Sequence, residues 1–328
     1  MPLALSLLDL AFIRPGGTAA ESLAHSVDLA KAAESAGYGR VWYAEHHAMP
    51  TIASSAPAVV IAHVAAHTRT IRLGAGGVML PHHSPLVVAE QFGTLAELHP
   101  GRIDLGLGRA PGGDRGVYAA LRRAPEDSDR FPEDVRELQG LLAGDPRLDG
   151  LVATPGAGTR VPLYVLGSSL FGAQLAAQLG LPYAFASHFA PQALEQAVAL
   201  YRGTYQPSEQ HPEPFVIAGV NVIASEDGDE ARAELAAARR YRVRALLKRG
   251  PATREHSDDE IEAFLTTPQG QGIAAMMSKA AVGTPDEVRV GLEAFAEEAR
   301  ADELITVHPS LDPAARIRSV RLAGDALR

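Results

Sequence analysis

The sequence predicts an α/β fold, a (β/α)8 TIM barrel in which parallel strands are each followed by a helix. Short apolar runs alternate with longer segments of helical periodicity along the chain. The apolar runs are nearly continuous, as in parallel strands that are buried on both faces. Chemically reactive residues gather where the predicted strands end, which is the active-site end of a barrel.

A doubly wound open sheet is the alternative architecture. The first predicted strand, however, leads into DLAFIRPGGT instead of the glycine-rich turn of a dinucleotide-binding fold. The predicted strands are Leu3–Leu10, Arg40–His47, Ile71–Leu80, Arg102–Gly108, Leu163–Ser169, Tyr183–Phe189, Phe215–Ser225 and Glu303–Pro309. The predicted helices are Glu21–Gly37, Ala56–Thr68, Pro85–His99, Asp129–Gly144, Leu170–Gly180, Gln192–Tyr205, Asp227–Lys248, Thr284–Ala299 and Pro313–Leu327.

The segment after the seventh predicted strand and its helix breaks this pattern. Residues 250–281 are polar and irregular, with only weak helical periodicity. A capped helix follows, in which Thr284 is the N-cap and Glu287 completes the capping box. We therefore expect one barrel domain over residues 1–328, with a mobile lid inserted at 250–281.

Composition limits the possible partners. The chain has 328 residues, of which 46% are hydrophobic and 21% charged, and its formal net charge is −9. This charge argues against a general nucleic-acid or anionic-membrane binder. There is no cysteine, so disulfide and thiolate chemistry are excluded. No apolar run is long enough to span a bilayer, and the first residues lack the pattern of a secretory signal, so we expect a cytoplasmic protein.

One candidate anion site lies in LGSSLFG, Leu166–Gly172, where a strand leads into a helix. The hydroxyls of Ser168 and Ser169 and the free amides of the first helical turn can hold an anion. Arg109, at the end of LGLGRAPGG, can reach the same anion from the neighbouring strand. Alternatively, the serines cap the helix and Arg109 pairs with a carboxylate such as Asp114. The combination at one end of a barrel favours a phosphate site.

A second candidate is the glycine pair Gly76-Gly77 within the third predicted strand. Glycine weakens a strand unless a ligand or another backbone approaches closely. The pair therefore makes room for a flat ring, or else forms a bulge or a tight barrel corner. This stretch alone does not decide between the two.

The stretch WYAEHHAMP, Trp42–Pro50, contains the third candidate. Strand alternation places His46 on one face and Glu45 and His47 on the other. Because adjacent histidines then point apart, we expect no metal site and favour His46 as a base or hydrogen-bond partner beside a bound ring. A metal-dependent barrel hydrolase that uses His46, His47 and His82 ranks last. His47, His82 and His83 are otherwise interpreted as structural, with the last two in a loop that can lie at the surface.

The motifs resemble those of the bacterial-luciferase-like flavin monooxygenases over nearly the whole chain. The strongest similarity runs from Val41 to Asp114 and includes AEHH and GAGGVMLPHHSPLVVAEQFGTLAELHPGRIDLGLGRAPGGD. VPLYVLGSSLFGAQLAAQLGLPYAFASHFAP and AVGTPDEV extend it. The resemblance implies a luciferase-like barrel of the single-chain branch that binds reduced FMN, and it implies that 250–281 is the family's mobile lid.

The resemblance also implies roles for single residues. His46 is similar to the family's proposed catalytic base at the reactive edge of the flavin. Gly76 and Gly77 match a pair that is joined by a non-proline cis peptide beneath the flavin ring. The implied cofactor contacts are Gly76, Gly77, Val78, Arg109, Ser168, Ser169, Leu170, Phe171 and His188. Among these, Arg109, Ser168 and Ser169 would hold the phosphate, with backbone amides from Leu170 and Phe171, and His188 would lie near the ring.

The expected function is a two-component monooxygenase. A separate flavin reductase would supply reduced FMN, and oxygen would act on a small organic substrate. Two departures from luciferase, Ser168-Ser169 in place of a glutamate-serine pair and Gly108 in place of a reactive cysteine, mean that light emission is not implied. The alternatives are a deazaflavin-dependent hydride-transfer enzyme and a flavin-binding protein without turnover. The resemblance also implies a homodimer, formed by helices near the second and third strands.

Overall fold

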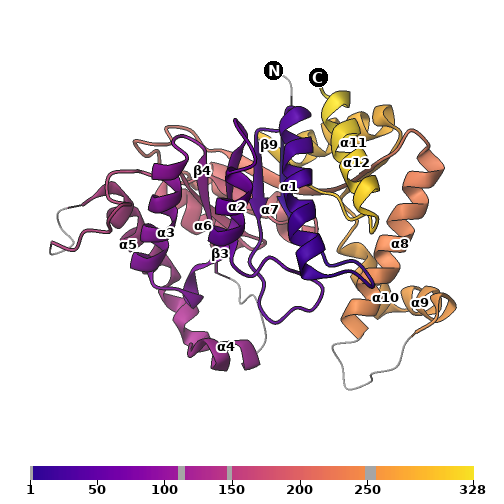
Figure 1. The fold of residues 1–328 in the computed structure, drawn as a ribbon, viewed down its shortest axis with the longest axis horizontal. Helices are drawn as coiled ribbons and strands as arrows, with labels where there is room; N and C mark the ends of the chain where they lie inside the picture. The colour runs from indigo at the N-terminus through magenta and orange to yellow at the C-terminus, as the bar shows by residue number, and fades with distance from the viewer. Residues whose placement is uncertain (1–2, 110–114, 146–149, 248–255) are drawn as a thin grey trace.

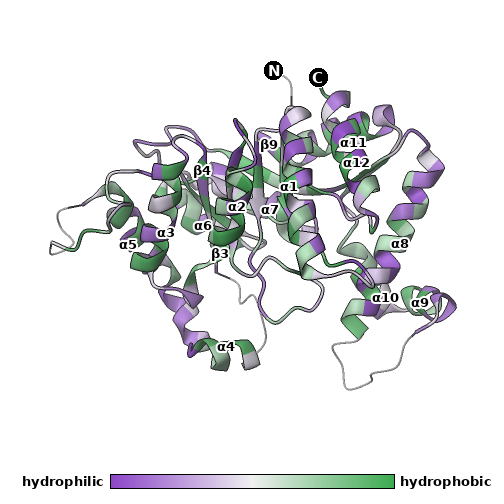
Figure 2. Cartoon of the chain, in the orientation of Figure 1, coloured by the Kyte–Doolittle hydropathy of each residue, from purple (hydrophilic) through white to green (hydrophobic). Residues whose placement is uncertain are grey.

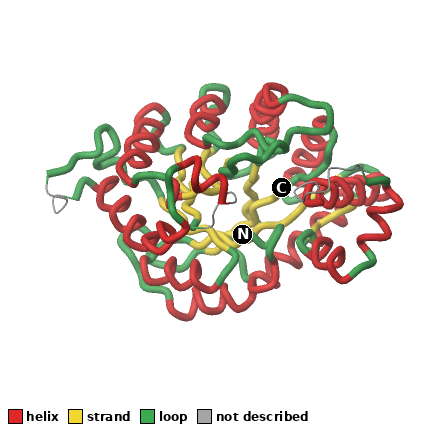
Figure 3. The backbone as a smooth tube through the Cα atoms, turned by 90° about the horizontal axis from the view of Figure 1, so that it is seen from below, coloured by secondary structure: helices red, strands yellow, loops and turns green. Residues whose placement is uncertain are grey.

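Eight parallel strands close into a barrel that is surrounded by helices, as the sequence predicts (Figure 1). The computed structural model describes residues 3–109, 115–145, 150–247 and 256–328. Strands β1 to β6 pair in chain order, β6 pairs with β7, β7 with β9, and β9 with β1, which closes the ring. Figure 3 shows the strands grouped inside a shell of helices.

The strands are β1 Ala4–Asp9, β2 Arg40–Tyr43, β3 Arg72–Met79, β4 Ile103–Gly108, β5 Leu163–Gly167, β6 Tyr183–Phe185, β7 Val216–Ala224, β8 Ala280–Gly283 and β9 Glu303–Val307. The α-helices are α1 Ala19–Ser35, α2 Pro57–Ala65, α3 Pro85–Leu98, α4 Arg115–Leu121, α5 Phe131–Ala143, α6 Leu170–Leu179, α7 Leu194–Thr204, α8 Gly228–Leu247, α9 Asp258–Leu265, α10 Pro268–Ala275, α11 Pro285–Ala299 and α12 Pro313–Ala326. Short 3-10 helices are η1 Leu80–His82, η2 Pro125–Arg130 and η3 Pro191–Ala193.

All the predicted strands are shorter in the structure, most of them by one or two residues, and β2 and β6 lose four residues each. Strand β2 ends at Tyr43 instead of His47, and β6 ends at Phe185 instead of Phe189. After β2 the chain turns towards other loops, where the His46 N–H donates to the Ser54 carbonyl at 3.0 Å. The polar residues expected at the strand ends therefore lie in the loops above the barrel, where their side chains can converge.

Strand β8 was not predicted from the sequence. The first half of β7 pairs with β6 and β9 inside the barrel, and its second half, Asn221–Ala224, pairs with β8 outside the closed ring. Within the predicted lid, residues 256–279 contain the helices α9 and α10, so this part is more regular than expected. Residues 250–255 of that prediction lie outside the described residues.

The core has two layers that follow the alternation of side chains along the strands. The outer layer packs the barrel against the helices and includes Tyr43, Leu73 and Leu105. The smaller inner layer fills the barrel with Leu8, Trp42, Ala44, Tyr164, Ala184, Ile217, Ile305 and Val307. Figure 2 shows apolar residues along the strands, and a mixture of polar and apolar residues on α8. No helix of the described residues is long and apolar enough to cross a membrane.

A buried ionic network closes the barrel at the N-terminal ends of its strands. Arg40 lies between two carboxylates, with Nη1 2.9 Å from Asp104 Oδ2 and Nε 2.9 Å from Glu303 Oε1. Asp104 also pairs with Arg72 and accepts a hydrogen bond from Trp42 Nε1 at 3.3 Å. Paired charges fill this end of the barrel, so the opposite end is the candidate ligand site.

Candidate functional site at the C-terminal mouth of the barrel

His46 and His188 lie near each other at the C-terminal end of the barrel. His188 follows β6, and its carbonyl accepts a hydrogen bond from Asn221 Nδ2 at 2.8 Å. Its ring packs over Gly219 so closely that a Cβ there would lie 2.4 Å from His188 Nδ1. Burial lowers the pKa of His188 to about 3, and repulsion by Arg242 and His46 adds to the effect. His188 is therefore neutral near pH 7.

The glycine pair forms a cis peptide between Gly76 and Gly77, as the resemblance implies. The ladder between β3 and β4 shifts register between Ala75 and Val78, so the pair also marks a bulge. A Cβ on Gly76 would lie 2.8 Å from Leu8 Cδ1, and one on Gly77 would lie 2.7 Å from the Gly106 carbonyl oxygen. Close packing within the protein thus explains why both positions are glycine.

Val78 is buried, with 3% of its surface exposed, and belongs to the outer core layer. Its side chain therefore packs towards the helices. Any contact that Val78 makes with a ligand at the barrel mouth would be through its backbone.

Arg109 and the N-terminus of α6 come together at one side of the mouth. The Arg109 guanidinium carbon lies 4.3 Å from the centre of the Phe171 ring, a cation–π contact. Ser169 is the N-cap of α6, but its side chain makes no capping hydrogen bond. Ser169 therefore occupies the cap position of the alternative interpretation, but its hydroxyl does not cap the helix. Ser169, Leu170 and Phe171 are exposed, which leaves the first turn of α6 accessible.

Arg109 also has protein partners, as its alternative interpretation predicted. Its Nη2 lies 3.2 Å from Asp129 Oδ1, and its Nε donates to the Ser128 carbonyl at 3.1 Å. The expected partner, Asp114, lies outside the described residues. The Asp129 side chain is 76% exposed, so this ion pair is screened by water and easily exchanged for another anion.

Glu45 organises the histidines that follow β2 and β3. Its side chain is fully buried, and Oε1 lies 2.7 Å from His47 Nε2 and 2.7 Å from His83 Nε2. The Met79 N–H donates to Oε2 at 3.1 Å. Burial opposes ionisation of Glu45, but the contacts with His83, His47 and Met79 outweigh it and lower the pKa of the carboxyl. Strand alternation predicted that Glu45 and His47 share a face.

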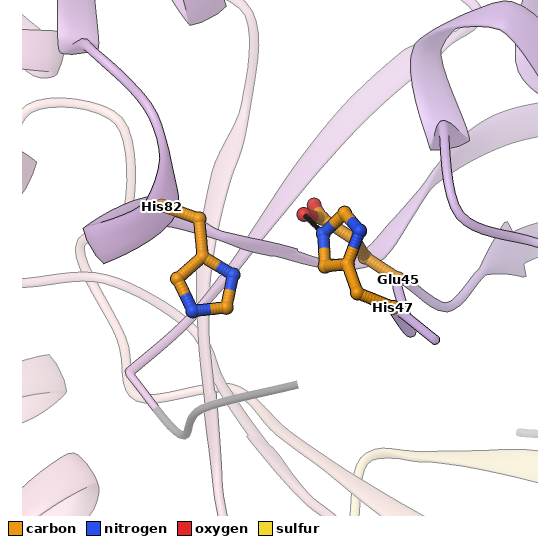
Figure 4. A group of neighbouring side chains, drawn as sticks. All are labelled: Glu45, His47 and His82. Atoms are coloured by element: carbon orange, nitrogen blue, oxygen red, sulfur yellow. Dashed lines mark hydrogen bonds and ion pairs between the residues drawn. The ribbon is translucent and has the colours of Figure 1, made fainter. Parts of the chain in front are cut away.

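His82 departs from its expected place at the surface. It belongs to η1 and is only 7% exposed, because its ring is in edge contact with Tyr118 and lies beside His47. Glu45, His47 and His82 bring one oxygen and two nitrogens within 4.8 Å of one another (Figure 4). The hydrolase alternative required His46 in such a set, and the structure places Glu45 there instead.

Two other strand-end residues serve the packing of α1 and α12. Asp9 accepts from Ser26 Oγ at 2.5 Å and pairs with Arg316 Nη2 at 3.1 Å. His308 contacts Ser319 Oγ at 2.7 Å and Thr306 Oγ1 at 3.1 Å. Both side chains are buried with these partners, so their position at a strand end does not make them site residues.

Sequence analysis did not identify Arg242 as a candidate. It lies on α8, and burial lowers its pKa. It has no ion pair or hydrogen bond with any residue that the structure describes. The dense run of arginines in ARRYRVRALLKR signals a charged helix, but nothing in it shows which arginine turns towards the barrel.

The barrel and the residues at its mouth agree with comparisons with known proteins. A family model described as luciferase-like monooxygenase matches residues 3–303. A luciferase-like monooxygenase of Escherichia coli is 46% identical over 326 residues, which are 98% of this chain and 96% of that protein. The N-acetyl-S-alkylcysteine monooxygenase of Bacillus subtilis is 34% identical over 98% of both chains. The chain belongs to the luciferase-like monooxygenase family.

Solved structures agree with this fold. Apo-MsnO8 superposes with a TM-score of 0.88 at 36% identity, covering 99% of this chain and 98% of that one. Two other barrels are each 18% identical and share the fold alone. The FMN complex of the oxygenating constituent of 3,6-diketocamphane monooxygenase from Pseudomonas putida has a TM-score of 0.71 and covers 98% of this chain and 96% of that one. An F420-dependent secondary alcohol dehydrogenase has a TM-score of 0.72, with full coverage of both chains.

Proposed function

We propose that this protein is a two-component, flavin-dependent monooxygenase that receives reduced FMN from a separate reductase and uses oxygen on a small organic substrate. The observation that carries the proposal is the pairing of Arg109 with the exposed N-terminus of α6. His46 and His188 lie at the same end of the barrel. Family membership supports a monooxygenase, and the chemistry of the mouth supports FMN.

The donors around Arg109 fit a phosphate group. A planar guanidinium binds phosphate oxygens through two parallel hydrogen bonds. The first turn of α6 adds amides that have no intrahelical acceptor, here those of Leu170 and Phe171. The hydroxyls of Ser168 and Ser169 complete the set, and the uncapped state of Ser169 leaves its hydroxyl available.

The ring would lie over the end of β3. Backbone groups of Gly76, Gly77 and Val78 would contact it, and neutral His188 would border it. Bound reduced FMN would supply the electrons that activate oxygen. His46 would hold or accept a proton at the reacting edge. The predicted lid at 250–281 would exclude water.

The test begins with binding. The protein is titrated without oxygen with reduced FMN, oxidised FMN and a deazaflavin, and the fluorescence of Trp42, the only tryptophan in the sequence, is followed. We expect saturable binding with a preference for reduced FMN. A preference for the deazaflavin would favour the alternative of a deazaflavin-dependent hydride-transfer enzyme. Binding of none of the three would overturn the proposal.

Turnover is measured next, with reduced FMN supplied by a flavin reductase. N-acetyl-S-alkylcysteines are the first candidate substrates, because a relative that is 34% identical acts on them. His46→Ala is expected to keep FMN binding and to lose most substrate oxidation. His99→Ala, at the C-terminus of α3, is the matched control. Flavin binding without oxygen-dependent product from any substrate would favour the non-catalytic alternative.

A homodimer through α2 and α3 is part of the proposal. Val59 on α2 is 69% exposed and Val87 on α3 is 44% exposed, and the two helices are neighbours. Figure 2 shows α2 as almost entirely hydrophobic. Exposed apolar surface of this kind favours an interface. Light scattering is expected to show a dimer for the wild type and a larger monomer fraction for Val59→Glu; a monomeric wild type would refute this interface.

A further inference from the structure

The cluster of Glu45, His47 and His82 has no role in the flavin proposal. One carboxylate oxygen and two imidazole nitrogens lie within 4.8 Å of one another, and they come from two segments, the loop after β2 and η1 (Figure 4). The Glu45 side chain is fully buried and that of His47 is 19% exposed. Three such donors facing one point are the composition of a metal site.

His82 gives an independent indication that a partner belongs here. The residue is 7% exposed, and neither Nδ1 nor Nε2 has a hydrogen-bond partner among the described residues. Buried polar atoms in native proteins nearly always have one. The edge contact with Tyr118 fixes the ring beside His47 without satisfying either nitrogen. A ligand between His82 and Glu45 would satisfy one of them.

The surroundings of Glu45 also resemble a metal site. His83 Nε2 lies 2.7 Å from its Oε1, and the Met79 N–H donates to Oε2 at 3.1 Å. Such contacts orient a carboxylate that binds a metal and tune its charge. His83 would then support Glu45 from outside the ligand set.

We propose that Glu45, His47 and His82 bind a divalent transition-metal ion, with zinc as the best-fitting probe. Two imidazoles and one carboxylate suit zinc and leave a fourth position open for water or another ligand. His47 exchanges its contact with Glu45 for a bond to the ion and carries its proton on Nδ1. The positive ion neutralises the buried carboxylate. This ligand set differs from the sequence-based expectation of no metal, which rested on the divergence of His46 and His47.

The first experiment is calorimetric titration of the full-length protein with Zn²⁺ after treatment with a chelator and without flavin. We expect one tight site per chain, and at least tenfold weaker binding for His82→Ala. The matched control is His67→Ala. His63 on α2 and His67, two residues beyond its end, are both exposed, with ring centroids 4.7 Å apart, and such a pair can bind zinc adventitiously. The control should leave the tight site unchanged.

A second variant tests coordination directly. The chain has no cysteine, so a thiolate introduced by His82→Cys is unique. With Co²⁺ we expect a near-ultraviolet thiolate-to-metal charge-transfer band that zinc abolishes. Circular dichroism confirms that each variant is folded.

Three results would overturn the metal site: no zinc binding by the wild type, equal binding by the wild type and His82→Ala, or no cobalt band from folded His82→Cys. Loss of the zinc signal in His67→Ala would assign the ion to the surface pair and would also overturn it. All these measurements are made without flavin, so their outcome is independent of the proposed monooxygenase activity.

Discussion

The guanidinium of Arg109 stacks on the ring of Phe171 and thereby joins the end of β4 to the N-terminus of α6. The contact holds a cation beside the first turn of α6. It also leaves Arg109 in an exposed ion pair with Asp129 that an incoming phosphate can replace. This relationship brings two separate sequence motifs together, as the proposed phosphate site requires, and it supplies the first prediction.

Arg109→Met should weaken binding of reduced FMN about 10- to 100-fold, because charge-assisted hydrogen bonds contribute about 1.5–3 kcal/mol. Anaerobic fluorescence titration measures the change. Arg130→Met is the control, since Arg130 is exposed on η2 and pairs with Asp134 at 3.7 Å. Equal affinity of the wild type and Arg109→Met would remove Arg109 from the phosphate site.

Asp104→Asn should destabilise the barrel without touching its mouth. The change removes the buried anionic partner of Arg72 and leaves Arg40 with Glu303 alone, and breaking such a pair costs about 3–5 kcal/mol. The free energy of unfolding by urea gives the effect. Asp129→Asn, with a side chain that is 76% exposed, should change it by less than about 0.5 kcal/mol. A small loss of unfolding free energy for Asp104→Asn would mean that the buried ionic network contributes little to stability.

Arg242→Met should raise the pKa of His188. Burial is the main cause of its low value and persists in the variant, so the pKa should rise from about 3 but stay below the ordinary 6.5. The His188 ring signals in an NMR titration report it. Arg240→Met is the control, because Arg240 pairs with Asp258 and Glu262 instead. An unchanged His188 titration in Arg242→Met would show that the two groups do not interact.

His308→Gln should reduce the sensitivity of the fold to acid. Burial, with repulsion from Arg316, lowers the pKa of His308 to about 3, against 6.5 as its ordinary value. The unfolded chain thus binds the proton more readily than the folded chain. The contribution of neutral His308 to the free energy of unfolding is complete above pH 6.5 and is lost as the pH falls towards 3.

Urea unfolding from pH 7 to 4 measures this dependence. The wild-type free energy should fall more steeply than that of His308→Gln, by up to about 1.4 kcal/mol per pH unit. His188 has a pKa lowered in the same way and keeps part of the acid sensitivity in the variant. His67→Gln on the surface should follow the wild type. Parallel curves for the wild type and His308→Gln would contradict the prediction.

The barrel could be predicted because the sequence features that specify its strands and helices lie within each element. Apolar runs, Pro285 in the first turn of α11 and the capping box of Thr284 with Glu287 mark elements without reference to the rest of the chain. Strand β8 could not be predicted, since its four residues acquire meaning only through pairing with the end of β7. The early ends of β2 and β6 have the same origin in tertiary contacts.

In the candidate site, too, local features could be predicted from the sequence and tertiary contacts could not. Glu45 and His47 contact each other, in agreement with strand alternation, although β2 ends at Tyr43. The burial of His82 depends on Tyr118, which is 36 positions away in the sequence. The approach of Arg242 to His188 depends on how α8 packs against the barrel. Alternation and motif spacing carry no information about either contact.

Strand β7 pairs with the closed ring through its first half and with β8 through its second half, so ring closure does not depend on β8. The segment that contains α8, α9 and α10 therefore begins after β7 and ends at β8, the strand that pairs with β7. A segment of another length or composition between β7 and β8 would leave the closure of the ring unchanged. Closure of the ring is thus independent of the segment between β7 and β8, so this segment can differ while the barrel and the buried ionic network at its N-terminal end stay constant.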